Sequence, residues 1–446
     1  MTKVETSRQE GRERRVAVPR SSHAEWVPAA NRRSPVAVLQ QENSTRVPEL
    51  VPIRMQRMAD SPFSFFRGAA RVMALDLLET PSTGQKVQVC GDAHLTNFGL
   101  FATPERKLVF DLNDFDETLP GPWEWDVKRL AASAAIVAKW RGFPRSVGQE
   151  AVHAGVTAYR RGMARHARQS LVDVFYEQLV PENVRATALE QLREISFQST
   201  IAASRKRTSD RLLRKLAVEV NGSYQIVDNP PLINHLNVLT NEPEALRGLY
   251  DGYLASLPPE RAELVARYEV VDFARKVVGV GSVGTRCFVA LLIDPTGAPL
   301  FLQIKQAVDS VLAILPDAPT IEHNGKRVTD GQRRMQAASD LFLGHSQALD
   351  FQTYVRQLAD MKGSIDPATI PAAALTSYIA RCGEVLARAH ARSGDPAAIS
   401  GYLGKDSEVF DRAIVEYADR VTIQNELDHA ELVHAIADGS VPVADL

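Results

Sequence analysis

The sequence predicts an α+β protein in which a small β-rich lobe accompanies a larger, mainly helical lobe. Long segments at residues 126–218 and 366–446 place apolar residues at helical spacing. Between them, residues 266–365 contain short β-branched and apolar runs separated by turn sequences, a pattern typical of strands. We therefore expect the helical lobe to be assembled from chain segments on both sides of the β-rich lobe.

The composition is that of an ordinary globular protein and limits the expected partners. The chain has 446 residues, of which 45% are hydrophobic and 24% charged, so it is long enough for sizeable cores. Its formal net charge of −2 provides no basic field for nucleic acid or an anionic membrane. No apolar run approaches the roughly 20 residues that a membrane-spanning helix needs. The expected partners are therefore small molecules or other proteins, with no nucleic acid and no membrane.

The cysteines indicate a reducing compartment. Cys90, Cys287 and Cys382 are odd in number, far apart in sequence and without metal-ligand spacing. We therefore expect free thiols and a cytoplasmic location.

The first 35 residues are rich in arginine and are expected to form a solvated arm. Pro19 and Pro28 prevent this arm from being one long helix. Its arginines are not followed by the apolar segment of an export signal. The rest of the chain is expected to divide into three parts: large-lobe residues 36–265 with the catalytic and metal-binding loops, the small lobe at 266–365, and a helical segment at 366–446 that packs on the large lobe.

Local patterns place two polar motifs on a path of short strands. A helix is expected at residues 62–78, and the turn at residues 81–84 ends it. A short strand at residues 87–90 then leads into a polar loop, and a turn at residues 103–106 separates two further apolar segments. Each motif therefore follows directly on a strand.

The two motifs have the residue types that phosphoryl transfer requires. The first reads Cys90-Gly-Asp-Ala-His-Leu-Thr-Asn97, and the second contains Asp111, Asn113, Asp114 and Asp116. A carboxylate such as Asp92 can orient an acceptor hydroxyl, while an amide and a second carboxylate hold Mg²⁺ against nucleotide phosphates. Asp92 and Asn97 also cap turns readily, and a solvated acidic turn is an alternative for Asp116. The density of acids nevertheless favours a cation site, because clustered carboxylates are costly without one.

These residues resemble the aminoglycoside phosphotransferases and related kinase-like enzymes. That group carries His-Gly-Asp-x-His-x-x-Asn, then Ile-Asp-Phe-x-Asp, then an Asp-Leu-Ala helix start. Cys90 replaces the leading histidine, Asp114 matches the second pattern, and Asp126 follows twelve residues later, as the resemblance predicts. The resemblance implies a protein-kinase-like two-lobed fold in which Asp92 is catalytic and Asn97 and Asp114 bind Mg²⁺. Asp111 and Asp116 are the alternative metal ligands.

The stretch from residue 91 to residue 126 looks more specifically like an uncharacterised bacterial family, catalogued as domain of unknown function 2252. This resemblance covers nearly the whole chain. It names a family without supplying a substrate.

A glycine-rich nucleotide lid is expected far downstream of these motifs. Gly279, Gly281 and Gly284 have G-x-G-x-x-G spacing, and Ser282 between them could donate to a phosphate. A dinucleotide-binding fold would need a helix after the glycines, whereas a strand at residues 287–293 follows here and favours a kinase-type lid. An ordinary hairpin turn is the alternative.

Lys305, at the end of an expected strand at residues 300–305, could hold the α- and β-phosphates of ATP. A solvated lysine at a strand edge is the alternative. The resemblance implies that a helix at residues 327–340 corresponds to the one whose carboxylate pairs with this lysine in kinases. Asp330 is the candidate for that pairing.

The order of the motifs is reversed relative to kinases, in which the lid and the lysine precede the catalytic loop. We therefore expect a circularly permuted chain, which is tolerated because the same contacts form in a different chain order. The predicted function is ATP- and Mg²⁺-dependent phosphoryl transfer to a hydroxyl of a small-molecule or protein acceptor. Two alternatives are a non-catalytic nucleotide-binding (pseudokinase) module, because Cys90 replaces the histidine, and transfer of AMP on the same fold.

Overall fold

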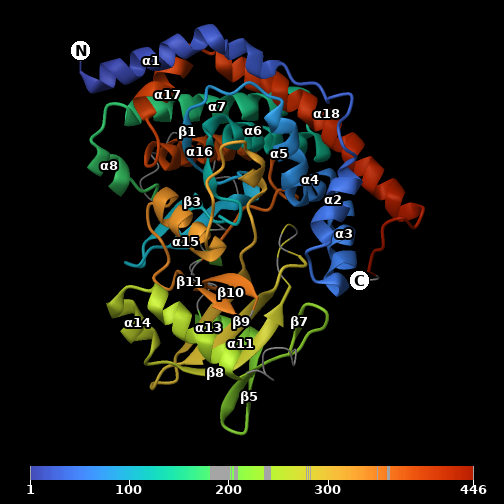
Figure 1. Ribbon diagram of the computed structural model, residues 1–446, viewed down its shortest axis with the longest axis vertical. Coiled ribbons are helices and arrows are strands. Elements are labelled where there is room, and N and C mark those ends of the chain that lie inside the picture. Colours follow the sequence, from blue (N-terminus) through green and yellow to red (C-terminus); the bar gives the residue numbers. More distant parts are fainter. Residues whose placement is uncertain are drawn as a thin grey trace.

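The computed structural model confirms the α+β class (Figure 1). It describes residues 2–180, 201, 203–204, 209–235, 243–277, 279, 281, 283–348, 350–358 and 362–444. A helical part occupies the upper half of Figure 1, and one larger sheet lies in the lower half. Among the described residues, no helix is both long and apolar enough to cross a bilayer.

Long helices from both ends of the chain build the helical part. The central ones pack closely on one another: α6 (Trp123–Trp140), α7 (Arg145–His166), α16 (Ala372–Ala391) and α18 (Val409–Ala437). Their core contains Trp123 stacked on Tyr159, with ring centroids 5.7 Å apart. Shorter helices complete this part: α1 (Lys3–Ala17), α2 (Pro35–Asn43), α3 (Val51–Ala59), α4 (Pro62–Gly68), α5 (Ala70–Leu78), α8 (Leu171–Tyr176) and α17 (Pro396–Leu403).

The larger sheet has six strands, and its neighbouring strands are all antiparallel. Its order is β11-β12-β10-β9-β8-β7. The strands are β7 (Ile233–Asn234), β8 (Glu269–Lys276), β9 (Cys287–Ile293), β10 (Pro299–Gln306), β11 (Gly344–Ala348) and β12 (Phe351–Gln357). Lys305 pairs with Tyr354 of β12, so it lies on an interior strand and not at a sheet edge.

The two faces of this sheet have different neighbours, because successive side chains of a strand point to opposite faces. One face packs its apolar residues against α13 (Pro243–Ser256). On the other face, Phe301 belongs to an apolar cluster that includes residues of α11 (Ser209–Leu216). Lys305 lies four residues further along β10 on that same face, where it meets the acidic segment around Asp116.

The polar motifs lie on short strands between the helical part and the sheet. The strand β1 (Lys86–Val89) pairs with β4 (Leu119–Pro122), and β2 (Phe98–Ala102) pairs with β3 (Leu108–Leu112). The predicted alternation of strand, loop, strand, turn and strand is therefore present. The helix expected at residues 62–78 is instead two helices, α4 and α5, because Ala69 leaves the helical conformation.

The N-terminal segment is not the solvated arm that its arginines suggested. Helix α1 packs against α17, where Gly11 is buried (Figure 1). Arg15 donates to the carbonyl oxygen of Tyr402 at 2.8 Å, and Arg20 donates to that of Leu403 at 2.6 Å. These arginines therefore satisfy the carbonyl groups at the end of α17, which otherwise have no partner inside that helix.

Replacing Gly11 with alanine is expected to release α1 from α17. A Cβ atom at residue 11 would lie 1.9 Å from the carbonyl oxygen of Ala398, so the two helices must separate. Overpacking of this kind costs about 1–3 kcal/mol, and faster amide exchange of residues 3–17 would report it. Gly248→Ala is the control, since nothing lies within 4 Å of a Cβ atom there. Equal exchange of residues 3–17 in the wild type and the Gly11 variant would contradict the contact.

The expected boundary at residue 265 is also wrong. Helices α13 and α14 (Pro259–Val265) belong with the sheet, because Leu249, Tyr253 and Val265 share an apolar core with β9, β10 and β12. The hydroxyl group of Tyr253 donates to the carbonyl oxygen of Phe342 at 2.8 Å. The amphipathic pattern of α13 predicts a helix without identifying its partner, which explains the error.

Candidate active site

The loop that carries Asp92 is held by a buried carboxylate. Asp126, in the first turn of α6, accepts hydrogen bonds from the backbone nitrogens of Cys90 at 2.6 Å and Gly91 at 2.9 Å. His390 of α16 lies 3.1 Å from the same carboxylate and is buried. His390 therefore helps to hold Asp126 in place.

Gly91 is required where this loop begins. Its φ angle of 79° lies in the left-handed region, and a Cβ atom there would be 2.4 Å from the carbonyl oxygen of Glu117. The close approach brings the Asp92 loop against the second acidic motif. The two motifs therefore approach each other closely through their backbones.

Asp92 and Asn97 face the same space from one turn. The side-chain nitrogen of Asn97 donates to the carbonyl oxygen of Asp92 at 2.7 Å, which leaves its amide oxygen for another ligand. Asp92 forms an ion pair with Arg129 of α6, and His94 lies 3.5 Å away. Burial raises the pKa of Asp92 to about 6, although Arg129 acts in the opposite direction.

The second motif divides into a structural acid and site-facing acids. Asp111 is buried, pairs with Arg388 at 2.5 Å and accepts from the backbone nitrogen of Ala337 at 2.9 Å. These two contacts therefore occupy both carboxylate oxygens of Asp111. Asp114 lies three residues later and lines a cavity together with Asp92 and Asn97.

Lys305 pairs with Asp116 at 2.5 Å, and the hydroxyl group of Tyr354 donates to the other oxygen of Asp116 at 2.5 Å. Burial alone would lower the pKa of Lys305, but Asp114 and Asp116 hold it well above its ordinary value. Asp116 is therefore directed toward the lysine, and its side chain is 28% exposed.

Asp330 is not the partner of Lys305, because it pairs with Lys326 one turn earlier on α15 (Asn324–Met335). The helix packs with Gly331 against Thr118 and directs Arg327 to the carbonyl oxygens of Asp116 and Thr118.

One cavity brings most of the predicted residues together. It has about 870 Å³ of atom-free space, part of it open to solvent. Asp92, Asn97 and Asp114 line it together with Gly279 and Gly281 of the glycine-rich segment. Lys305 is absent from its lining and reaches the site through Asp116, which does line it. Gly284 lies next to Arg46, and Ser282 lies outside the described residues.

Two arginines hold the glycine-rich segment in place, Arg46 in the bend after α2 and Arg57 on α3. Arg46 donates to the carbonyl oxygens of Gly281 and Val283 at 2.9 and 2.6 Å, and Arg57 donates to that of Gly279 at 2.7 Å. Sequence reasoning missed these residues, and Arg67 and Arg129 as well. Single arginines on amphipathic helices carry no local sign of such a role, and only the three-dimensional contact reveals it.

The oxygen donors of the cavity fit Mg²⁺. This ion is usually held by one or two protein oxygens plus water and substrate phosphates, so a complete protein cage is not required. Asn97 offers its amide oxygen and Asp114 its carboxylate. Among the described residues, no group of three or more His, Cys, Asp or Glu side chains could hold a metal without further ligands. The donor set therefore suits a cation that arrives with a phosphate ligand.

Comparison with known proteins identifies a family. The model of a family described as uncharacterised proteins conserved in bacteria, DUF2252, matches residues 46–435. The chain belongs to the DUF2252 family. The matched range includes all of the larger sheet and every cavity residue that is discussed above. No curated protein and no solved structure matches the chain.

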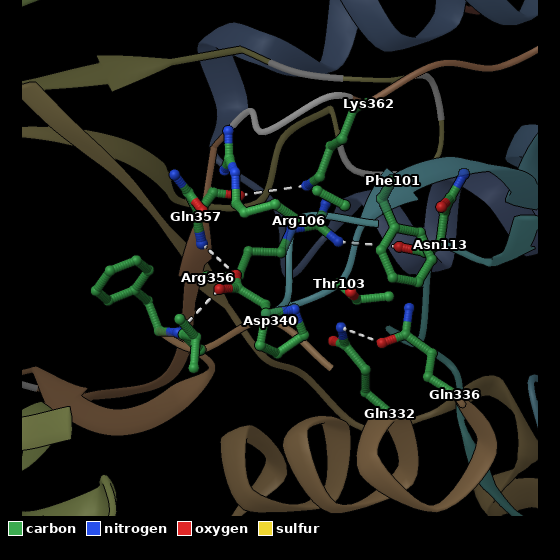
Figure 2. Close-up of a pocket in the computed structure, with 14 residues that line it drawn as sticks. Phe101, Thr103, Arg106, Asn113, Gln332, Gln336, Asp340, Arg356, Gln357 and Lys362 are labelled. Carbon is green, nitrogen blue, oxygen red and sulfur yellow. Dashed lines mark hydrogen bonds between the residues drawn. The ribbon is translucent and has the colours of Figure 1, made fainter. Parts of the chain in front are cut away.

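A second cavity of this DUF2252 protein is lined by Asn113, the residue next to Asp114 (Figure 2). It has about 750 Å³ of atom-free space, part of it open to solvent. In Figure 2, Gln332 and Gln336 extend into it from α15, while Arg356 and Lys362 approach from the other side. Among the described residues, none of the predicted catalytic, metal-binding or cofactor-binding residues lines this cavity.

Replacing Lys362 with methionine is expected to stabilise the protein near pH 6 and to have less effect near pH 10. Burial, reinforced by Arg356, lowers the pKa of Lys362 from 10.5 to about 7. Below pH 7 the ammonium group is charged in both the folded and the unfolded chain, so its burial cost is fully present. Above pH 10.5 it is neutral in both, and the cost disappears. We expect a gain of about 1–3 kcal/mol in unfolding free energy at pH 6.

Urea unfolding at the two pH values measures this effect. Lys326→Met, at an exposed position of α15, is the control and should change stability by less than about 0.5 kcal/mol at either pH. A stability difference between wild type and Lys362→Met that grows with pH would contradict the sign of the pKa shift.

Proposed function

We propose that this protein is an ATP- and Mg²⁺-dependent phosphotransferase that acts on a hydroxyl group of a small-molecule or protein acceptor. The observation that carries the proposal is the shared cavity of Asp92, Asn97, Asp114, Gly279 and Gly281. These residues come from distant parts of the chain and match the separate requirements of a base, metal ligands and a phosphate-covering loop. The proposal includes a protein-kinase-like fold that has two lobes and a circularly permuted chain.

The arrangement of elements supports the permutation. The glycine-rich segment joins β8 to β9, Lys305 follows on β10, and α15 and β12 come next. After β12 the chain returns to the motif strands, where the backbone groups of Gly363 and Leu100 exchange hydrogen bonds of 2.9 and 2.6 Å. The part that would come last in an ordinary kinase therefore precedes this sheet in the sequence and adjoins it in space.

Each residue has a defined role in the proposed reaction. Asp92 accepts the proton of the acceptor hydroxyl as the hydroxyl oxygen bonds to the γ-phosphorus of ATP. The bond between that phosphorus and the bridging oxygen of the β-phosphate breaks, and ADP leaves with its electron pair. Asn97 and Asp114 would hold Mg²⁺, which neutralises phosphate charge when bound. Lys305, held by Asp116, supplies positive charge near the phosphates.

Two features favour a weaker form of the proposal, nucleotide binding without chemistry. Arg129 is paired with the carboxylate of Asp92, and Cys90 stands where related enzymes have histidine. The thiol of Cys90 contacts the carbonyl oxygen of Asp114 at 3.2 Å, so this position contributes to the shape of the metal loop. Binding without transfer is therefore a distinct outcome of the experiment below.

Calorimetric titration with ATP in the presence and absence of Mg²⁺ tests binding first. We expect Mg²⁺-dependent binding to the wild type and at least tenfold weaker binding after Asp114→Ala, since a lost charged ligand is worth about 1.4 kcal/mol or more. Incubation with Mg·ATP and a deproteinised bacterial extract, followed by mass spectrometry, then tests transfer. A product that gains phosphate supports the proposal, one that gains AMP assigns nucleotidyl transfer, and a lack of nucleotide binding overturns both.

A further inference from the structure

Arg67 lies at the end of α4, where the helix meets the candidate active site. Its side chain lines the same cavity as Asp92, Asn97 and Asp114, and a Cβ atom on Gly281 would lie 3.4 Å from its carbonyl oxygen. It is therefore placed between the catalytic loop and the glycine-rich segment.

The end of α4 is fixed by two other buried arginines. Arg54 donates to the carbonyl oxygen of Gly68 at 2.9 Å, and Arg129 donates to that of Phe66 at 3.0 Å. These carbonyl groups flank Arg67 on both sides in the sequence. The backbone at Arg67 is therefore set before any ligand binds, which lowers the entropy cost of binding.

One nitrogen of the Arg67 guanidinium group lacks a partner among the described residues. Within the part of the chain that the structure describes, its Nε atom is buried and has no hydrogen-bond partner. Burial lowers the pKa of Arg67, while Asp92 and Asp114 oppose that shift through charge alone. By contrast, Arg129 pairs with Asp92, and Arg46 donates to two carbonyl oxygens of the glycine-rich segment.

A buried donor without a partner is costly, so this group points to an anionic ligand. We propose that Arg67 binds the γ-phosphate of ATP, an inference that rests on the proposed function and names the group that this side chain recognises. The transferred phosphoryl group lies between the base and the metal ligands, and Asp92 and Asp114 are the carboxylates that influence Arg67. A planar guanidinium presents parallel donors to phosphate oxygens and stabilises the charge that develops there.

The proposal predicts discrimination between ATP and ADP, because ADP lacks the group that Arg67 binds. Calorimetric titration of the full chain with Mg·ATP and with Mg·ADP gives the ratio of the two dissociation constants. For Arg67→Met we expect the dissociation constant of Mg·ATP to rise about tenfold or more, while that of Mg·ADP changes less than twofold. Arg71→Met is the control, since this nearby arginine of α5 does not line the cavity, and both dissociation constants should stay unchanged.

The binding of Mg·ADP shows at the same time that the variant is folded. Arg67→Gln keeps a polar side chain of similar length and decides the question if Arg67→Met does not fold. If a folded variant binds Mg·ATP and Mg·ADP with an unchanged ratio of dissociation constants, the role of Arg67 is overturned. This includes the case in which the binding of both nucleotides weakens equally. The proposed function would still stand. Failure of the wild type to bind either nucleotide would instead overturn the proposed function on which the inference rests.

Discussion

Replacing Asp92 with asparagine is expected to reduce turnover by about 10²–10⁴-fold while leaving the affinity for Mg·ATP within about threefold of the wild type. A positioned general base contributes a factor of this size, and asparagine cannot accept the proton. The amide retains an oxygen that can accept from Arg129, so the loop should keep its conformation. Product formation under saturating ATP, together with calorimetric binding of Mg·ATP, separates the chemical step from nucleotide binding.

Asp60→Asn provides the matched control, because Asp60 is exposed and lies outside the cavity. Its turnover should equal that of the wild type. Unchanged turnover in Asp92→Asn would remove Asp92 from the mechanism. A parallel loss of nucleotide binding would show that the residue shapes the site instead of accepting a proton.

Replacing Asp126 with alanine is expected to cause the largest loss of stability, about 2–5 kcal/mol. The change removes the acceptor of two backbone nitrogens in the catalytic loop and leaves His390 without its carboxylate partner in a buried position. Each buried group that loses its partner carries a full desolvation cost. Urea unfolding followed by circular dichroism measures the effect, and turnover should fall with it because the Asp92 loop loses its support.

The pair of Asp419 and Arg145, of which the arginine is exposed, is the control for this change. Asp419→Ala removes a carboxylate 2.7 Å from an arginine, but the arginine side chain is 76% exposed, so we expect a loss below about 1 kcal/mol. Equal losses in the two variants would mean that Asp126 has no special part in holding the catalytic loop.

Much of the fold could be predicted because its signals are local. The strand of residues 287–293 matches β9, since β-branched and apolar residues are bounded there by a glycine segment and a turn. Helix α15 begins three residues before the predicted start, because His323 caps it by accepting from the backbone nitrogen of Lys326 at 3.1 Å. Such an imidazole cap gives no recognisable pattern. The partners of α1 and α13 were not predictable either, since an apolar face does not specify what covers it.

Part of the candidate site could be predicted, because its motifs are local in the sequence. Asp92, Asn97 and Asp114 stand in short motifs whose spacing indicates chemistry, and the structure places them in one cavity. The pairing of Lys305 with Asp116 depends on how the sheet meets the acidic loop. Contacts of this kind join residues nearly two hundred positions apart, and no local pattern encodes them.

The contact between α1 and α17 has a consequence for synthesis on the ribosome. Arg15 and its acceptor Tyr402 are 387 positions apart, so α1 waits about 20–80 s for its partner at ordinary elongation rates. During that time the basic helix leaves the exit tunnel without the surface that later covers it. Nascent chains halted before residue 396 should therefore expose residues 3–17 to protease, and the completed chain should protect them.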